Sequence, residues 1–217
     1  MGTAEIDPYS TLPPNPVPPK HPHLTPRWGL SYKKGRLYSV GMDILPILKT
    51  GKLIVVYASD AARTESMVLI AELGLRGAVT ILDGGNRYRP YQVATFLRRK
   101  TVDISSAANR LFSRRAFTCY EMNTLLCSTS SRNQPCVILD LLNTFYDDHV
   151  SMHEADRLLK SCLGQIQRLV LSGPVVLTLA PPLAEERAFL LKQVCAQADE
   201  VMIKEAPVCE PTQPSLF

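Results

Sequence analysis

The chain has 217 residues, of which 46% are hydrophobic and 20% are charged, and its formal net charge is +4 at pH 7. This composition is typical of one globular domain with a core of its own, and the mild positive charge allows a nucleic-acid partner without requiring one. The longest apolar runs, at residues 53–58 and 175–180, are far shorter than the roughly 20 residues of a membrane-spanning helix, so we expect no such helix and no membrane partner.

The two ends of the chain differ in composition from its middle. Residues 1–28 are rich in proline and lack the basic start and apolar stretch of a signal peptide. We predict a flexible arm over residues 1–28, a folded domain over residues 29–205 and a flexible tail over residues 206–217. The six cysteines include no CxxC pair, and most lie in apolar-periodic segments, which favours buried free thiols. With no export signal, we expect a cytoplasmic protein.

Short apolar runs alternate with amphipathic segments along the predicted domain. We predict strands at residues 53–58, 78–82, 108–112, 136–140, 175–179 and 200–204. We predict helices at residues 64–73, 91–99, 118–126, 154–170 and 183–198. Gly74 is expected to end the first helix, and Thr118 is expected to cap the third. This alternation predicts an α/β fold, with a mostly parallel central sheet and helices on both faces.

The loop after the first predicted strand is the first candidate site, because doubly wound sheets bind ligands at the carboxyl ends of their strands. Its sequence, YASDAART, occupies the position of a phosphate-binding loop with the pattern GxxxxGK[ST]. Tyr57 and Ala62 stand at the two glycine positions, Arg63 at the lysine, and Thr64 at the hydroxyl residue that binds Mg²⁺. Arg63 and Thr64 are therefore candidate nucleotide-binding residues, although Asp60 would repel a triphosphate. An ordinary connection between a strand and a helix is the alternative.

Asp140 is the second candidate. It ends the apolar run VILD, which has the form of a Walker B strand, whose carboxylate positions Mg²⁺. Asp140 is thus a candidate metal ligand through a bound nucleotide. The alternative is an aspartate that caps the helix after the strand.

Basic residues supply candidate contacts to DNA phosphates. They lie between positions 98 and 115 and comprise Arg98, Arg99, Lys100, Arg110, Arg114 and Arg115. Solvated helix ends, where cations also suit the helix dipole, are the alternative interpretation.

Five segments occur in the order and at about the spacing of the RecA/RadA recombinase ATPase core. They are VGMDIL with KTGK before the first strand, DGGNRYRP, ANR with RAFT, VILD and PVVLT. The second resembles the family's D-T-E-G-x-F-R-P segment, and the fourth is similar to its Walker B strand. The resemblance covers about residues 35–205. It implies a RecA-like P-loop NTPase fold, which would bind ATP and Mg²⁺ through Arg63, Thr64 and Asp140.

The departures from the family pattern concern catalysis. The glycines and the lysine of the phosphate-binding loop are replaced, and Gly85 stands where the family has its catalytic glutamate. Phosphoryl transfer depends on positioning and charge stabilisation, so the resemblance implies a protein without efficient ATPase activity.

Three functions follow from the resemblance and its departures. The first is a non-catalytic RecA-like subunit that assembles with other RecA-like or repair subunits in DNA recombination or repair, and that could bind single-stranded DNA. Family members associate through an extended segment that docks on a neighbouring core, and the arm before Trp28 could do this. The second is a slow Mg-ATPase that uses Arg63, Thr64 and Asp140. The third is a scaffold or regulatory subunit unrelated to DNA.

Overall fold

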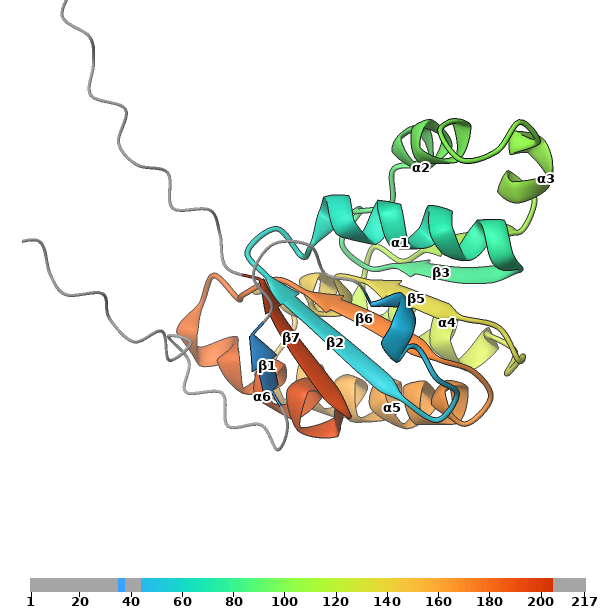
Figure 1. The fold of residues 1–217 in the computed structure, drawn as a ribbon. Helices are drawn as coiled ribbons and strands as arrows, with labels where there is room; N and C mark the ends of the chain where they lie inside the picture. The colour runs from blue at the N-terminus through green and yellow to red at the C-terminus, as the bar shows by residue number, and fades with distance from the viewer. Residues whose placement is uncertain (1–34, 38–43, 205–217) are drawn as a thin grey trace, which may run out of the picture.

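The computed structural model describes residues 35–37 and 44–204, which form a parallel sheet between two layers of helices (Figure 1). The predicted arm, the beginning of the predicted domain and the predicted tail lie outside these residues. Within the described residues, no helix is both long enough and apolar enough to cross a membrane.

The sheet has seven strands in the order β1-β7-β2-β6-β5-β3-β4, and every neighbouring pair is parallel. The strands are β1 (Gly35–Leu37), β2 (Leu53–Ala58), β3 (Val79–Asp83), β4 (Leu111–Arg115), β5 (Cys136–Leu139), β6 (Val175–Leu179) and β7 (Glu200–Lys204). All residues of β5 and β6 are buried, which explains their unbroken apolar sequences. The predicted α/β fold with a parallel central sheet is confirmed.

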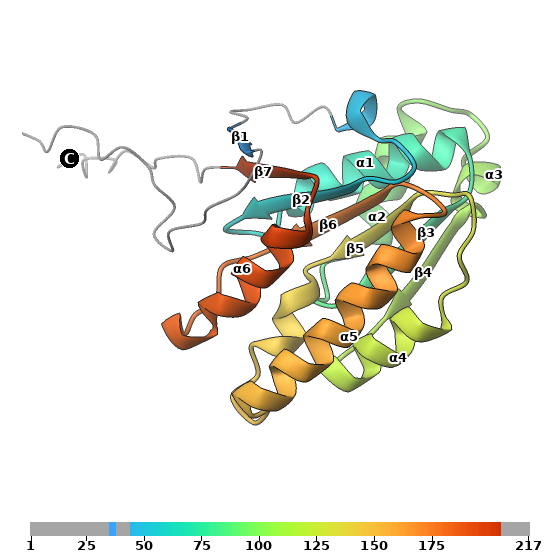
Figure 2. The ribbon, with the colours of Figure 1, turned by 90° about the horizontal axis from the view of Figure 1, so that it is seen from below.

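Helices cover both faces of the sheet (Figures 1 and 2). One face carries α1 (Arg63–Arg76), α2 (Pro90–Arg98) and α3 (Ile104–Ala108), with the 3₁₀ turn η1 (Leu45–Ile47) beside them. The other face carries α4 (Cys119–Ser128), η2 (Leu141–Phe145), α5 (Met152–Val170) and α6 (Ala188–Gln197), the last preceded by η3 (Glu185–Arg187). Alternate residues of each strand face the two helical layers, so the core consists of two apolar clusters separated by the sheet.

Three predicted element boundaries are wrong. Gly74 does not end α1, because the helix continues to Arg76. An added Cβ at Gly74 would lie 2.8 Å from Leu111 Cδ2, so this glycine allows α1 to pack closely against β4. The strand predicted at 108–112 is instead β4 at Leu111–Arg115, because the preceding residues form α3, where Asp103 accepts a hydrogen bond from Ser106 N at 3.0 Å. The last helix starts as η3, and its α-helical part begins at Ala188.

The predicted cap at Thr118 is confirmed, and the structure shows a second cap of the same kind at Ser151, before α5. Thr118 Oγ1 accepts a hydrogen bond from Glu121 N at 3.1 Å, and Ser151 Oγ accepts one from Glu154 N at 3.3 Å. Both are N-caps of the kind that satisfies a free backbone donor in the first turn. The five cysteines that the structure describes are free thiols, and all but Cys127 are buried.

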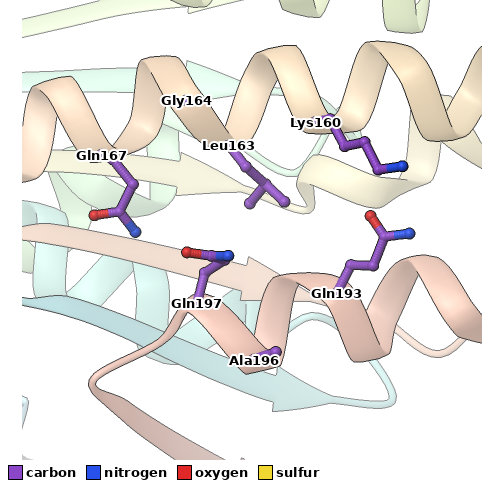
Figure 3. A pocket seen from close by; sticks show the side chains of 7 residues that line it. All are labelled: Lys160, Leu163, Gly164, Gln167, Gln193, Ala196 and Gln197. Carbon is purple, nitrogen blue, oxygen red and sulfur yellow. The ribbon is translucent and has the colours of Figure 1, made fainter.

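A groove of about 570 Å³ separates α5 from α6 on the outer side of their layer (Figure 3). Its lining residues are Lys160, Leu163, Gly164, Gln167, Gln193, Ala196 and Gln197. Lys160 and Gln193 are both tied to Asp156, at 2.7 and 2.6 Å, so the two helices share a polar link at one end of the groove.

Candidate functional site

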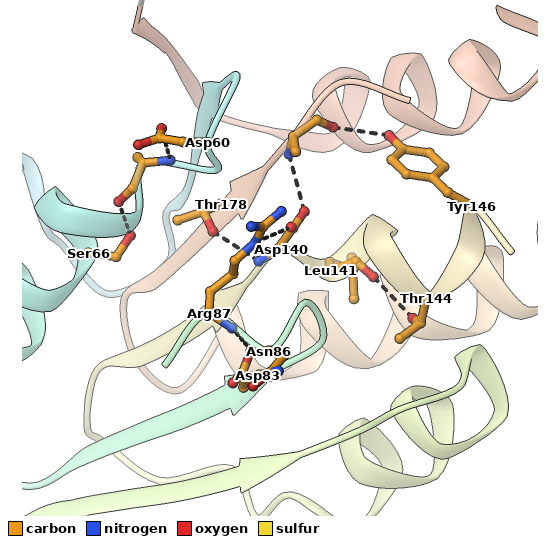
Figure 4. Close-up of polar contacts among 12 residues, drawn as sticks. Asp60, Ser66, Asp83, Asn86, Arg87, Asp140, Leu141, Thr144, Tyr146 and Thr178 are labelled. Carbon is orange, nitrogen blue, oxygen red and sulfur yellow. Dashed lines mark hydrogen bonds and ion pairs between the residues drawn. The ribbon is translucent and has the colours of Figure 1, made fainter. Parts of the chain in front are cut away.

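The loops that follow β2, β3 and β5 lie at the same edge of the sheet, because all three strands are parallel (Figure 4). β3 and β5 are direct neighbours, whereas β6 lies between β5 and β2. The two candidate segments from the sequence, the loop before α1 and Asp140, are therefore on one edge but two strands apart.

Asp83, at the end of β3, organises the loop that follows it. Its Oδ1 accepts a hydrogen bond from Arg87 N at 2.8 Å, and its Oδ2 accepts one from Tyr88 N at 3.1 Å. Arg115, at the end of the neighbouring strand β4, donates Nε to the same Oδ2 at 3.0 Å. Asp83 is 1% exposed. This buried carboxylate therefore fixes the conformation of the loop, and the guanidinium of Arg115 balances its charge.

The three residues after Asp83 allow the loop to fit closely against α4 and Asp140. A Cβ at Gly84 would lie 2.7 Å from Met122 Cε, and a Cβ at Gly85 would lie 2.5 Å from Asp140 Cβ. Asn86 has a φ of 54°, in the left-handed region that asparagine tolerates better than most residues. The loop backbone therefore lies directly against Asp140, and no side chain fits at position 85.

Asp140 is completely buried at the end of β5, and donors from the protein surround it (Figure 4). Arg87 donates Nε to its Oδ2 at 2.7 Å, and Ala180 N donates to its Oδ1 at 3.2 Å. Its own backbone N donates to Thr178 Oγ1 at 2.9 Å. Burial raises the pKa of Asp140, and the hydrogen bond from Arg87 opposes that shift. The side chain makes no capping hydrogen bond to η2, so the alternative that Asp140 caps the next helix is wrong.

The loop between β2 and α1 is short and tightly turned. Ala61 and Ala62 have φ values of 55° and 50°, and both are 1% exposed. Asp60 Oδ1 accepts a hydrogen bond from Ala62 N at 3.0 Å (Figure 4). The carboxylate of Asp60 thus takes one of the backbone donors that a phosphate-binding loop would offer to its ligand.

Arg63 and Thr64 form the first turn of α1 beside this loop. Thr64 is exposed, whereas Arg63 Nε is buried and finds no hydrogen-bond partner among the residues that the structure describes. Lys204, at the end of β7, lies 2.6 Å from Glu65 Oε1 and 3.9 Å from Asp60 Oδ2. The charge of this lysine is directed to two of the chain's own carboxylates.

These residues do not fit the Mg²⁺ and ATP that the resemblance implies. Asp60 places a negative charge where a phosphate would bind, and Arg87 already occupies the carboxylate that would position Mg²⁺. In the described part of the chain, no group of three or more His, Cys, Asp or Glu side chains could hold a metal ion.

Four of the six basic candidates lie near the second half of α1. Arg98, Arg99 and Lys100 are exposed at the end of α2, and Lys100 Nζ lies 2.9 Å from Glu72 Oε1 of α1. Arg110 Nη1 donates to the backbone oxygen of Leu75 at 3.3 Å. These contacts bring basic residues from two segments, 98–100 and 110, to one end of α1.

The other two basic candidates lie elsewhere. Arg114 Nη1 donates to Ser128 Oγ of α4 at 3.3 Å, on the opposite helical layer, and Arg115 pairs with Asp83. The six residues therefore do not form one face, and Arg115 has an internal role.

Sequence reasoning missed Arg87 and Asp83 as site residues. The sequence holds a usable signal, because Asp83 and Asp140 each end an apolar run and Arg87 lies four residues after Asp83. That signal does not reveal which strands are neighbours, and only the fold places Arg87 on Asp140.

Comparison with known proteins adds no family to this geometry. No protein-family model matches the chain, and no curated protein is similar to it in sequence.

Proposed function

We propose that this chain is a non-catalytic, cytoplasmic RecA-like subunit that assembles with other RecA-like or repair subunits. The order of the strand-end loops supports the proposal, because the candidate phosphate loop, the DGGNRYRP loop and Asp140 all lie at one edge of a parallel sheet. The positive φ of Asn86 supports the alignment of that loop, since the resembling family has glycine there.

The packing of Gly85 carries the non-catalytic part of the proposal. The resemblance puts the glutamate that activates water at this position, and here the backbone touches the carboxylate of Asp140. A Cβ at Gly85 would lie within 2.6 Å of Asp140 Oδ2, so a glutamate could not occupy position 85 in this arrangement. Without a general base or a phosphate cradle, the residues that would position and activate an attacking water are missing.

The test is to measure phosphate release and thermal unfolding with millimolar ATP and Mg²⁺. We expect no phosphate release above that of the Asp140→Asn variant, and no rise in Tm for the wild-type chain. Any ligand of the folded state would raise the Tm by mass action, so this measurement also detects binding without hydrolysis. Mg²⁺-dependent phosphate release that Asp140→Asn abolishes would contradict the proposal and favour the slow ATPase.

The outer edge of β4 supports the assembly part of the proposal. Among the strands that the structure describes, β4 is the last of the sheet, and residues 112–115 are all exposed, including Phe112, which is 52% exposed. A groove of about 310 Å³ lies where β3 and β4 meet the segment that follows α4. It is lined by Thr80, Phe112, Ser113, Arg114, Thr129, Ser130, Arg132 and Gln134. A strand edge that no described residue pairs, with such a groove close by, suits an extended segment of a partner, which would add to the sheet.

Single-stranded DNA is the proposed nucleic-acid partner, and the basic residues at the end of α2 support it. We expect Arg98→Glu/Arg99→Glu to lower affinity for a single-stranded oligonucleotide by about 10-fold at moderate salt, and to flatten the salt dependence. Fluorescence anisotropy across a salt series measures both effects. The matched control is Arg157→Glu/Lys160→Glu, which reverses two exposed charges on α5 and should leave binding unchanged. Equal affinities for all three proteins would remove DNA from the proposal and favour the scaffold function.

A further inference from the structure

Arg87 connects the two carboxylates that end β3 and β5. Its backbone N donates to Asp83 Oδ1 at 2.8 Å, and its side-chain Nε donates to Asp140 Oδ2 at 2.7 Å. The side chain of Arg87 is 21% exposed, and that of Asp140 is 0% exposed. A single residue of the loop therefore brings a cation to a buried carboxylate from a neighbouring strand.

Asp140 is also tied to β6, the strand on its other side. Ala180 N donates to its Oδ1, and its own N donates to Thr178 Oγ1. The contacts of Arg87 and Asp140 thus join the carboxyl ends of β3, β5 and β6. An ionised carboxylate with no exposure is costly unless a cation lies beside it, and Arg87 supplies that cation.

A carboxylate at the end of a buried strand can be neutralised by a bound divalent ion or by a side chain of the protein. Here the guanidinium occupies the carboxylate oxygen that an ion would need. In the loop where a phosphate would bind, the carboxylate of Asp60 takes the place of the phosphate. It accepts a hydrogen bond from Ala62 N. Both charges that Mg–ATP would bring to this edge of the sheet are supplied by the chain.

We propose that Arg87 is a permanent internal cation that takes the place of a divalent metal ion at Asp140, and so holds the loop from Gly84 to Arg89 in one arrangement without nucleotide. The proposal rests on the proposed function, since it explains how a subunit that does not bind Mg–ATP keeps an ordered loop at its strand ends. Partner binding by this subunit is then independent of nucleotide.

The test compares the melting of Arg87→Ala, Arg87→Lys and Arg87→Ala/Asp140→Asn with that of the wild-type chain, with and without millimolar MnCl₂ and in the absence of nucleotide. Arg89→Ala is the matched control, because Arg89 lies in the same loop but its guanidinium donates to the backbone oxygens of Asn86 and Tyr88. Arg87→Ala is expected to lower the Tm by about 10 °C, since it leaves Asp140 buried without a cation.

Three further results are expected. Arg87→Lys retains most of the stability, because it keeps the charge. Asp140→Asn restores part of the Tm lost in Arg87→Ala, because it removes the uncompensated carboxylate. Mn²⁺ raises the Tm of Arg87→Ala by a few degrees through mass action, and changes neither the wild type nor the double variant.

The proposal is overturned if Arg87→Ala melts like Arg89→Ala, if Mn²⁺ stabilises the wild type, or if Mn²⁺ leaves Arg87→Ala unchanged. If Arg87→Ala does not fold, Arg87→Lys and the double variant still test the proposal. The proposal requires that both variants fold and that Mn²⁺ changes the Tm of neither. ATP hydrolysis by the wild-type chain would contradict the proposed function without altering these melting temperatures, so the two failures are distinguishable.

Discussion

Gly85→Ala is expected to lower the free energy of unfolding by about 3 kcal/mol, which is a fall in Tm of roughly 6–12 °C for a chain of this size. The added Cβ would lie 2.5 Å from Asp140 Cβ and 2.6 Å from Asp140 Oδ2. Neither neighbour can move freely, because Asp140 is bonded to Arg87 and Ala180. The loop must shift instead, and the shift lengthens the contact between Arg87 and Asp140. Denaturant unfolding followed by circular dichroism measures the loss.

Gly164→Ala is the matched control for this substitution. Gly164 lies within α5, and an added Cβ there meets nothing within 4 Å. Alanine has the higher helix propensity, so this variant should gain up to about 1 kcal/mol. If Gly85→Ala unfolds at the same denaturant concentration as the wild type, position 85 has room for a side chain, and the argument against a catalytic carboxylate there fails.

Ser113→Pro is expected to abolish assembly while leaving the domain folded. Arg110 O accepts a hydrogen bond from Val79 N at 2.8 Å, and Ala116 N donates to Asp83 O at 3.0 Å. Hydrogen bonding alternates along a strand that is paired on one side, so the N–H of Ser113 points away from β3. Proline at this position removes an outward donor and leaves the pairing with β3 intact.

The measurement is recovery of partners by affinity purification of the tagged chain from cells that produce it, with mass-spectrometric identification. We expect the wild type and Ser113→Ala to recover a RecA-like or repair protein, and Ser113→Pro to lose it. The alanine variant controls for the side chain, because it keeps the N–H. Equal recovery with Ser113→Pro would show that β4 is not the docking edge. Partners without any link to DNA would favour the scaffold function.

Five of the described strands could be predicted to within one residue from the sequence, whereas β4 lies three residues later than predicted and β1 was not predicted. β2, β6 and β7 have the predicted bounds, because each is a short apolar run rich in β-branched residues and bounded by turns. β5 differs by one residue, since Asp140 takes a φ of 49° and leaves the strand. Buried parallel strands carry the strongest local signal, and that signal was sufficient for the fold class.

The polar contacts of the candidate site could not be predicted in the same way. Arg87 and Asp140 are separated by 53 residues, and their contact depends on β3 and β5 being neighbours. No local pattern encodes strand order. For the same reason the six basic candidates were treated as one group, although the structure divides them between two helical layers and assigns Arg115 to Asp83.

Of two glycines that the sequence analysis interpreted, Gly74 gave a wrong helix boundary and Gly85 marked a position of close packing. Gly74 has the usual signature of a helix end, but it lies inside α1 because Leu111 needs the space that a Cβ would fill. Gly85 was identified from the sequence as a missing carboxylate, and its packing against Asp140 was not foreseen. Whether a glycine serves a turn or a close contact depends on its spatial neighbours, which local sequence does not specify.

The contact between Gly85 and Asp140 also bears on how this sequence can evolve. A carboxylate at position 85 would collide with Asp140 while the ion pair between Arg87 and Asp140 is intact. Loss of Arg87 alone would leave the buried carboxylate of Asp140 without a counter-ion. We therefore expect each of these single substitutions to give a less stable protein. A side chain at position 85 becomes compatible with the fold only when Arg87 and Asp140 change with it, so we expect these three positions to change together in related sequences.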